Sequence, residues 1–178
     1  DLHSFPTRRS SDLASLTPTF DSLQGGETLA LSGTGTVSTS NVGSSKAVTL
    51  GTIALAAGSG NPSNYTLNSA NMNITQRVIN LDGIRAYDAT TNVLSSDINS
   101  FGNIVSGETL TISGTGSVGT NSVAMNKAIT IGSLSLGNGS GLASNYTLTG
   151  GTHTFDISPV SVNVTGSRQY NGTNIKTG

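Results

Sequence analysis

The chain has 178 residues, of which 34% are hydrophobic and 10% charged, and it contains 23 glycines and no cysteine. Its formal net charge of −1 gives no electrostatic footprint for nucleic acid, and the lack of cysteine excludes thiol chemistry and cysteine-ligated metal sites. No run of about 18 apolar residues occurs, so the sequence predicts no transmembrane helix. The profile is poor for an enzyme-like α/β domain, and it is not that of a disordered acidic or basic chain.

The first thirteen residues, DLHSFPTRRSSDL, have an origin different from the rest. All of them agree with one reading frame of a common sequencing-library adapter. We therefore expect residues 1–13 to be a non-native, adapter-derived segment and leave them out of the fold argument.

An internal repeat organises the chain from residue 14 onward. The sequence GETLALSGTG at residues 26–35 returns as GETLTISGTG at residues 107–116, and SNYTL at residues 63–67 returns at residues 144–148. Beyond that point a two-residue insertion changes the offset from 81 to 83 residues. Six of the seven later aromatic residues fall into matched pairs, which indicates one core plan used twice.

Short runs of alternating apolar residues predict strands in the first unit. Gly33 and Gly35 interrupt one run, which indicates a bulge or a close approach of two backbones. Another run changes side-chain parity at Gly51, as happens where a strand bulges or bends from one sheet to another. Turns are expected at Gly25 and Gly26 and across residues 57–63. The expected strands cover residues 17–23, 28–37, 47–55, 65–67 and 72–74.

No flexible linker separates the units. Ile74 ends the last strand of one unit, and Ile79 lies at the start of the next. After the second unit, Pro159 leads into an apolar alternation at residues 160–164, which predicts the opening strand of a third unit. Because a short joint limits bending, tandem units are expected to form a stiff or semi-stiff rod.

The pattern predicts an all-β fold made of tandem small β-sandwich repeats, immunoglobulin-like and about 82 residues long. A β-grasp-like unit with one helix is the alternative. A right-handed β-solenoid ranks third, because a solenoid coil is much shorter than this repeat.

No catalytic, cofactor-binding or metal-binding residues are predicted. The Gly33-Thr34-Gly35 stretch lacks the lysine and the following helix of a phosphate loop. His153 matches Ala70, so it belongs to no repeated set, and the scattered aspartates lack the spacing of a calcium loop. No acid, base and nucleophile recur together, which argues against an enzyme.

Two lysines, Lys46 and Lys127, occupy matching positions, as do Glu27 and Glu108. We expect each Lys and Glu to form a solvated ion pair worth at most about 1 kcal/mol. The alternative is an internal Lys–Asn cross-link promoted by the carboxylate, which would release ammonia and lower the intact mass.

Residues 85–91, RAYDATT, resemble the YDG-type repeat domain of bacterial filamentous-haemagglutinin-like surface adhesins, and residues 168–174, RQYNGTN, resemble it again. The family pattern is a basic residue, a spacer and Tyr-Asp-Gly-Thr-Thr, so Ala89, Asn171 and Asn174 depart from it. The later GETL, SGTG and NYTL motifs follow in the family's order, and the resemblance covers residues 14–178.

In this motif the two tyrosines, Tyr87 and Tyr170, are expected to pack one end of the sandwich. Asp88 or Asn171 would then shape a turn. A ligand contact at the same stretch is the alternative.

The resemblance implies structural stalk repeats of a bacterial cell-surface or secreted adhesin that project a distal binding region. The implied location is extracellular or at the bacterial cell surface, on the outer membrane. The alternative is that the repeats themselves bind host glycans or neighbouring adhesin chains. Buried tyrosines would favour a stalk, whereas a patch of exposed aromatics would favour binding.

The resemblance also implies which partners and parts to expect. Partners are adjacent repeats of the same chain and, through the parent adhesin, a host-surface glycan or protein; no cofactor, nucleic acid or enzymatic activity is implied. Residues 14–75 would be a first unit lacking its opening strand, and residues 76–158 a complete second unit. Residues 159–178 would open a third unit, whose first strand would lack its own partners.

Overall fold

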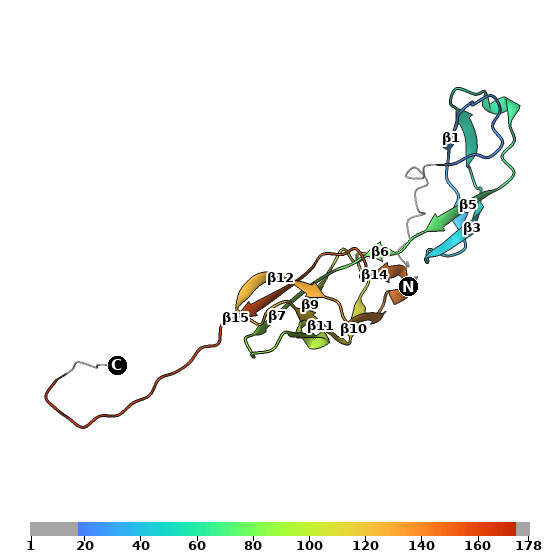
Figure 1. Cartoon of the computed structure of the whole chain (residues 1–178). Coiled ribbons are helices and arrows are strands. Elements are labelled where there is room, and N and C mark those ends of the chain that lie inside the picture. Colours follow the sequence, from blue (N-terminus) through green and yellow to red (C-terminus); the bar gives the residue numbers. More distant parts are fainter. Residues whose placement is uncertain (1–17, 174–178) are drawn as a thin grey trace, which may run out of the picture.

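The computed structural model describes residues 18–173. Figure 1 shows two strand-rich units arranged one after the other along the chain, followed by an extended segment at the C-terminal side. Over these residues the chain forms β-strands and three single-turn 3₁₀ helices but no α-helix. The predicted all-β, β-sandwich-like fold is therefore confirmed, and the β-grasp alternative lacks the helix that it requires.

The first unit consists of two small sheets. β1 pairs antiparallel with β4, whereas β2, β3 and β5 form a three-stranded antiparallel sheet. The chain thus crosses between the two sheets three times, from β1 to β2, from β3 to β4 and from β4 to β5. The elements are β1 (Leu29–Ser32), β2 (Thr36–Val37), β3 (Gly43–Thr49), β4 (Ala54–Ala57), η2 (Pro62–Asn64) and β5 (Ala70–Ile74).

The second unit repeats this plan and adds strands to it. A six-stranded sheet has the order β8-β11-β12-β15-β7-β9, and β10 pairs with β13 as β1 does with β4. β7 and β15, near the two ends of the unit, lie side by side and run parallel. The elements are β6 (Arg77–Val78), β7 (Asn80–Ala86), β8 (Asn92–Leu94), η3 (Ser95–Asp97), β9 (Ile98–Gly102), β10 (Leu110–Ser113), β11 (Thr115–Val118), β12 (Ala124–Thr130), β13 (Ser135–Asn138), η4 (Ala143–Asn145), β14 (Tyr146–Thr147) and β15 (His153–Ser158).

Glycines permit the crossing between sheets. Gly33 has a φ of +84°, and a Cβ atom there would lie 2.0 Å from the carbonyl oxygen of Thr52. The matching Gly114 has a φ of +92°, and its Cβ would lie 2.2 Å from the oxygen of Ser133. A side chain would meet both a disfavoured backbone conformation and a collision, so only glycine fits. The predicted close backbone approach is confirmed.

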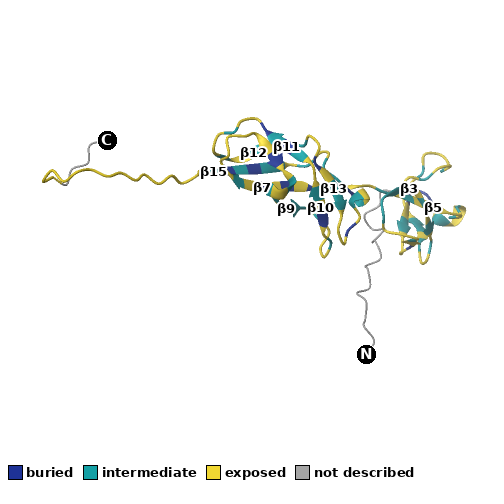
Figure 2. Ribbon diagram, turned by 90° about the horizontal axis from the view of Figure 1, so that it is seen from below, coloured by how far each residue is buried: buried dark blue, intermediate teal, exposed yellow. Residues whose placement is uncertain are grey.

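The buried core lies almost entirely in the second unit. Figure 2 shows the buried residues concentrated there, whereas the first unit is largely half-buried or exposed. Among the described residues of the first unit, Leu29 alone of the hydrophobic side chains is buried. The core cluster of the second unit consists of Ile79, Leu81, Val93, Leu110, Val118, Ile129, Leu134, Tyr146, Phe155 and Ile157.

Two predicted strands of the first unit are wrong. Residues 18–23, the described part of the first predicted strand, form no strand, and neither do residues 65–67. The matching Tyr146–Thr147 segment of the second unit is strand β14 because it pairs with β6, and none of residues 18–173 forms such a partner beside residues 65–67. Residues 159–173 are exposed and join no sheet, as expected of an opening strand without its partners.

Candidate functional site

The joint between the two units is short and hydrogen-bonded. Two residues separate β5 from β6. The side chain of Asn145, at the end of η4, reaches across to the first unit. Its Oδ1 accepts from the Val42 backbone N–H at 2.9 Å, and its Nδ2 donates to Asn41 Oδ1 at 3.0 Å. Because both ends of one amide are used, the contact fixes the orientation of that side chain.

The connecting segment is itself held by the second unit. Gln76 Nε2 donates to the carbonyl oxygens of Ser144 and Tyr146, each at 3.1 Å. The Arg77 guanidinium donates to Asn103 through its backbone oxygen at 2.5 Å and its side-chain Oδ1 at 2.8 Å. The joint therefore contains no freely rotating linker over residues 75–77.

The Tyr-Asp stretch forms a turn stabilised by its own side chains. Asp88 Oδ1 accepts from the backbone N–H of Thr90 at 2.9 Å and from its hydroxyl at 3.0 Å. The pKa of the Asp88 carboxyl is lowered, mainly because the Thr90 N–H donates to it. Ala89 has a φ of +65°, the left-handed conformation that favours glycine. This geometry explains why the motif has glycine at the third position.

Arg85 fastens this turn to the sheet. Its guanidinium forms an ion pair with Asp88 at 3.0 Å and donates to the carbonyl oxygens of Thr90 and Asn92. It also lies over the Phe155 ring, 5.6 Å from the ring centre, where a cation–π attraction applies. The basic residue of the motif thus connects the turn to the buried core.

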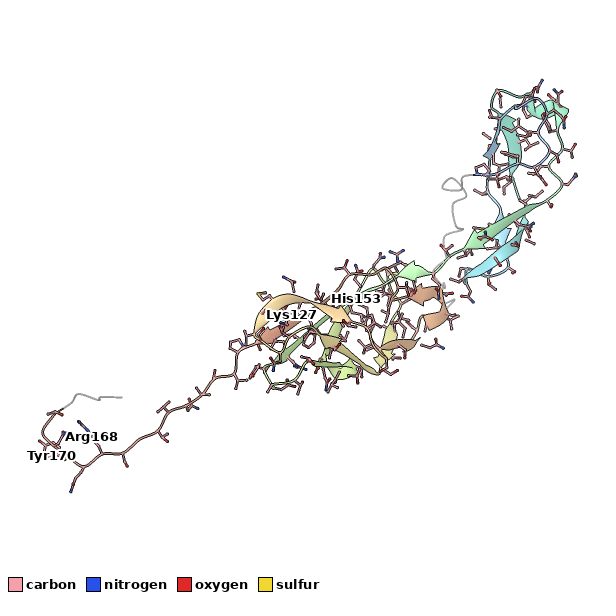
Figure 3. The ribbon with its side chains drawn as sticks, in the orientation of Figure 1. Lys127, His153, Arg168 and Tyr170 are labelled. Carbon is pink, nitrogen blue, oxygen red and sulfur yellow. The ribbon has the colours of Figure 1, made fainter. Side chains whose placement is uncertain are left out.

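The turn recurs in the C-terminal segment without the rest of a unit around it. Asn171 Oδ1 accepts from the N–H and the hydroxyl of Thr173, at 3.2 and 3.0 Å, and Arg168 donates to the Thr173 carbonyl. Figure 3 shows Arg168 and Tyr170 together on this segment, away from the folded units. The predicted turn is therefore confirmed and depends on local contacts only.

The family of the chain follows from these repeated features. The family model of the YDG domain matches residues 7–72 and 73–154. The chain belongs to the YDG domain family. The two matches correspond to the two units, and the first begins within residues 1–13. No curated protein and no solved structure matches the chain.

In both YDG units a glutamate pairs with a tyrosine rather than with a lysine. Tyr65 donates to Glu27 Oε2 at 2.7 Å, and Tyr146 donates to Glu108 Oε2 at 2.6 Å. Burial raises the pKa of the Tyr146 hydroxyl, and the hydrogen bond to Glu108 raises it further. The GETL and NYTL motifs therefore meet in space, a contact that the sequence analysis missed although both motifs recur at the same offset.

The expected Lys–Glu ion pairs are wrong. Lys46 Nζ donates to Thr39 Oγ1 at 2.7 Å and to the Asn41 carbonyl at 2.8 Å, and Lys127 Nζ donates to Thr120 Oγ1 at 2.8 Å. The glutamates are engaged by tyrosines instead. Over residues 18–173, the ion pair between Arg85 and Asp88 is the one that forms.

His153 has a structural role in the second YDG unit, where Figure 3 places it with Lys127. Its Nδ1 accepts from the Leu81 N–H at 3.1 Å, so Nε2 carries the hydrogen and donates to the Leu148 carbonyl at 2.9 Å. Within the part of the chain that the structure describes, no three His, Asp or Glu side chains gather as metal ligands. None of its helices is long and apolar enough to span a membrane.

The tyrosines of the motif do not pack as expected. Tyr87 is 42% exposed and Tyr170 is 92% exposed. By contrast, Tyr146 is buried in the core and Tyr65 is half-buried. The packing predicted for Tyr87 and Tyr170 is therefore wrong for the described chain, while Tyr146 behaves as a core residue.

Proposed function

We propose that the YDG units of this chain are structural stalk repeats of a bacterial cell-surface or secreted adhesin of the filamentous-haemagglutinin-like kind. In this role they project a distal binding region away from the cell. The observation that supports the proposal best is the joint, in which Asn145 of one unit bonds to Asn41 and Val42 of the other.

A stalk needs a joint that repeats along the chain. The loop that contacts Asn145 has a counterpart in the second unit, where Ser122 and Val123 match Asn41 and Val42. Val123 is 49% exposed, so this loop is open to a following unit, with the Ser122 hydroxyl in place of the Asn41 amide oxygen. Since each unit contacts only its neighbours, the stability of such an array grows by addition of similar units and interfaces.

The distribution of side chains fits a scaffold better than a binding surface. Each motif contributes one exposed tyrosine, Tyr87 or Tyr170, and one ring does not make an aromatic patch. The two repeated glutamates are satisfied within their own units, since Glu27 accepts from Tyr65 and Glu108 from Tyr146. We infer a role without catalysis, outside the cell, in which recognition belongs to other parts of the adhesin.

Small-angle X-ray scattering of the whole chain tests the joint. We expect one narrow distribution of maximum dimension for the wild type and a broader one for Asn145→Ala, which loses both cross-unit hydrogen bonds. Asn64→Ala removes the matching amide of the first unit, which has no part in this joint, and serves as the matched control. A Gly-Ser-Gly-Ser insertion after Thr75 marks the fully flexible limit. A wild type as flexible as the insertion variant would refute the stalk.

The alternative, in which the repeats bind host glycans, is tested by a glycan array probed with the same chain. The stalk predicts no specific signal. Glycan binding that disappears in Tyr87→Ala but persists in Asn145→Ala would favour recognition by the repeats themselves.

A further inference from the structure

The first unit carries a groove beside the outer edge of β5, lined by both apolar and polar side chains. No strand over residues 18–75 pairs with that edge, because β5 has β3 as its only neighbour there. The groove has a volume of about 680 Å³, and a second hollow of about 390 Å³ continues it past Tyr65. The larger apolar side chains that line the groove are Phe20, Leu31, Val48, Ile53, Leu67 and Met72.

These lining residues match core residues of the second unit. There the same positions lie in the hydrophobic core or pack against it, and β7 completes that core with the buried Leu81. β7 does so by pairing in parallel with β15, the counterpart of β5. The groove is therefore the space that β7 fills in the second unit. The matching residues are Phe101, Ile112, Ile129, Leu134, Leu148 and Phe155.

The counterpart of β7 is present at the other end of the chain. At the 83-residue offset, residues 160–168 match residues 77–85. Val162 and Val164 correspond to the buried Ile79 and Leu81, yet they are 84% and 94% exposed. The segment thus exposes an apolar row of the kind that no strand of residues 18–75 supplies to the groove.

A glycine strengthens the match. In the second unit a Cβ atom on Gly83 would lie 2.8 Å from Cδ2 of Phe155, so the ring packs directly against the glycine backbone. Gly166 stands at the corresponding position, although nothing lies within 4 Å of its own Cβ position. Because Gly166 has no side chain, the segment can pass over a large side chain such as Met72.

We propose that residues 160–168 of a second copy of this chain fill the groove as an added strand, parallel to β5. The register of β7 on β15 places Val164 beside Ala70, Gly166 beside Met72 and Arg168 beside Ile74. Backbone hydrogen bonds to the open edge give affinity, and the apolar row inserted into the groove gives specificity. The proposal does not depend on the role of the chain as a stalk.

The same copy cannot supply this strand to itself. Figures 1 and 2 show the segment leaving the end of the second unit that faces away from the first. Ser158 still pairs with Ala86, and only six residues lead from it to Val164. Six extended residues reach about 20 Å, the length of β15 alone, so the groove of the first unit is out of reach. The contact joins unlike surfaces of two copies and yields open chains or closed rings.

Sedimentation velocity over a concentration series tests the proposal on the full chain. We expect the mass of the wild type to rise with concentration above the 17.9 kDa of one copy. Val164→Asp places a charge in the groove and should weaken association by at least about tenfold, since an unpaired buried charge is costly. Thr165→Asp, the matched control, adds the same charge at a position whose counterpart in β7 faces outward. Both variants lie in the exposed segment, so neither unfolds a unit.

A synthetic peptide of residues 159–173, added to the Val164→Asp chain, locates the site. Hydrogen exchange should slow at residues 65–74 and not in the second unit. A wild type that stays monomeric at every concentration would overturn the proposal, as would equal effects of the two aspartate variants. Residues 65–74 protected in a monomeric chain before any peptide is added would also overturn it, because the groove would then be filled from within the same copy.

Discussion

The replacement Phe155→Ala tests whether the two units differ in their cores as the structure indicates. Phe155 is 0% exposed and packs against Gly83 and the guanidinium of Arg85. Its truncation leaves a cavity that the surrounding strands cannot close, and it should destabilise the second unit by about 3–5 kcal/mol. Met72 is the matching residue of the first unit, where it is half-buried and faces the open groove. Met72→Ala should cost its own unit less than about 1.5 kcal/mol, because little buried area is lost.

Hydrogen exchange monitored by mass spectrometry separates the two units within one molecule. In Phe155→Ala the amides of β7 and β12 should exchange between about a hundredfold and a few thousandfold faster, since each 1.4 kcal/mol is a factor of ten. In Met72→Ala the amides of β3 should accelerate by about tenfold or less. Equal acceleration in the two units would show that Met72 is as well packed as Phe155, and the reasoning would be wrong.

Three further predictions concern the second unit. Ala89→Gly should raise the thermal midpoint, with a gain of up to about 1 kcal/mol, because glycine tolerates the positive φ that alanine adopts there. A midpoint that falls would contradict this. Gly114→Ala should cost clearly more than the roughly 1 kcal/mol expected for Gly107→Ala, since both have positive φ but a Cβ at Gly114 also meets a facing carbonyl; equal losses in urea unfolding would count against it. The folded-state pKa of Tyr146 lies above its value of about 10 in the unfolded chain. The contribution of Tyr146 to stability is therefore complete below the unfolded-chain pKa of about 10 and is lost as the pH rises through the folded-state pKa. Tyr146→Phe should accordingly flatten the alkaline decline in the unfolding midpoint.

Features set by local geometry could be predicted from the sequence. The sequence indicated the bends of the chain between sheets at Gly33 and Gly51. A glycine that interrupts a strand, or that coincides with a change in which side chains face the core, is compatible with few backbone conformations other than a bend or bulge. The turn at Asp88 was predictable for the same reason, since its hydrogen bonds span two residues.

Features set by distant partners could not be predicted. SNYTL occurs twice, but Tyr146 begins a strand and Tyr65 does not, because only the former has β6 beside it. Each glutamate accepts a hydrogen bond from a tyrosine 38 residues away and not from a lysine. The spacing of these residues in the sequence does not indicate which of the two side chains the glutamate will contact. The parallel pairing of β7 with β15 joins the two ends of a unit, and no local pattern indicates it.

That parallel pairing has a mechanical consequence. β7 stands near the point where the chain enters the second unit, and β15 ends where the chain leaves it. Tension between the two ends pulls these neighbouring strands in opposite directions along their common axis. Their interstrand hydrogen bonds are then sheared together rather than opened one at a time, as they would be if the strands were peeled apart from one end. A complete unit should therefore yield to stretching in a single high-force step. The first unit, in which no strand of residues 18–75 pairs with the outer edge of β5, should extend at a lower force.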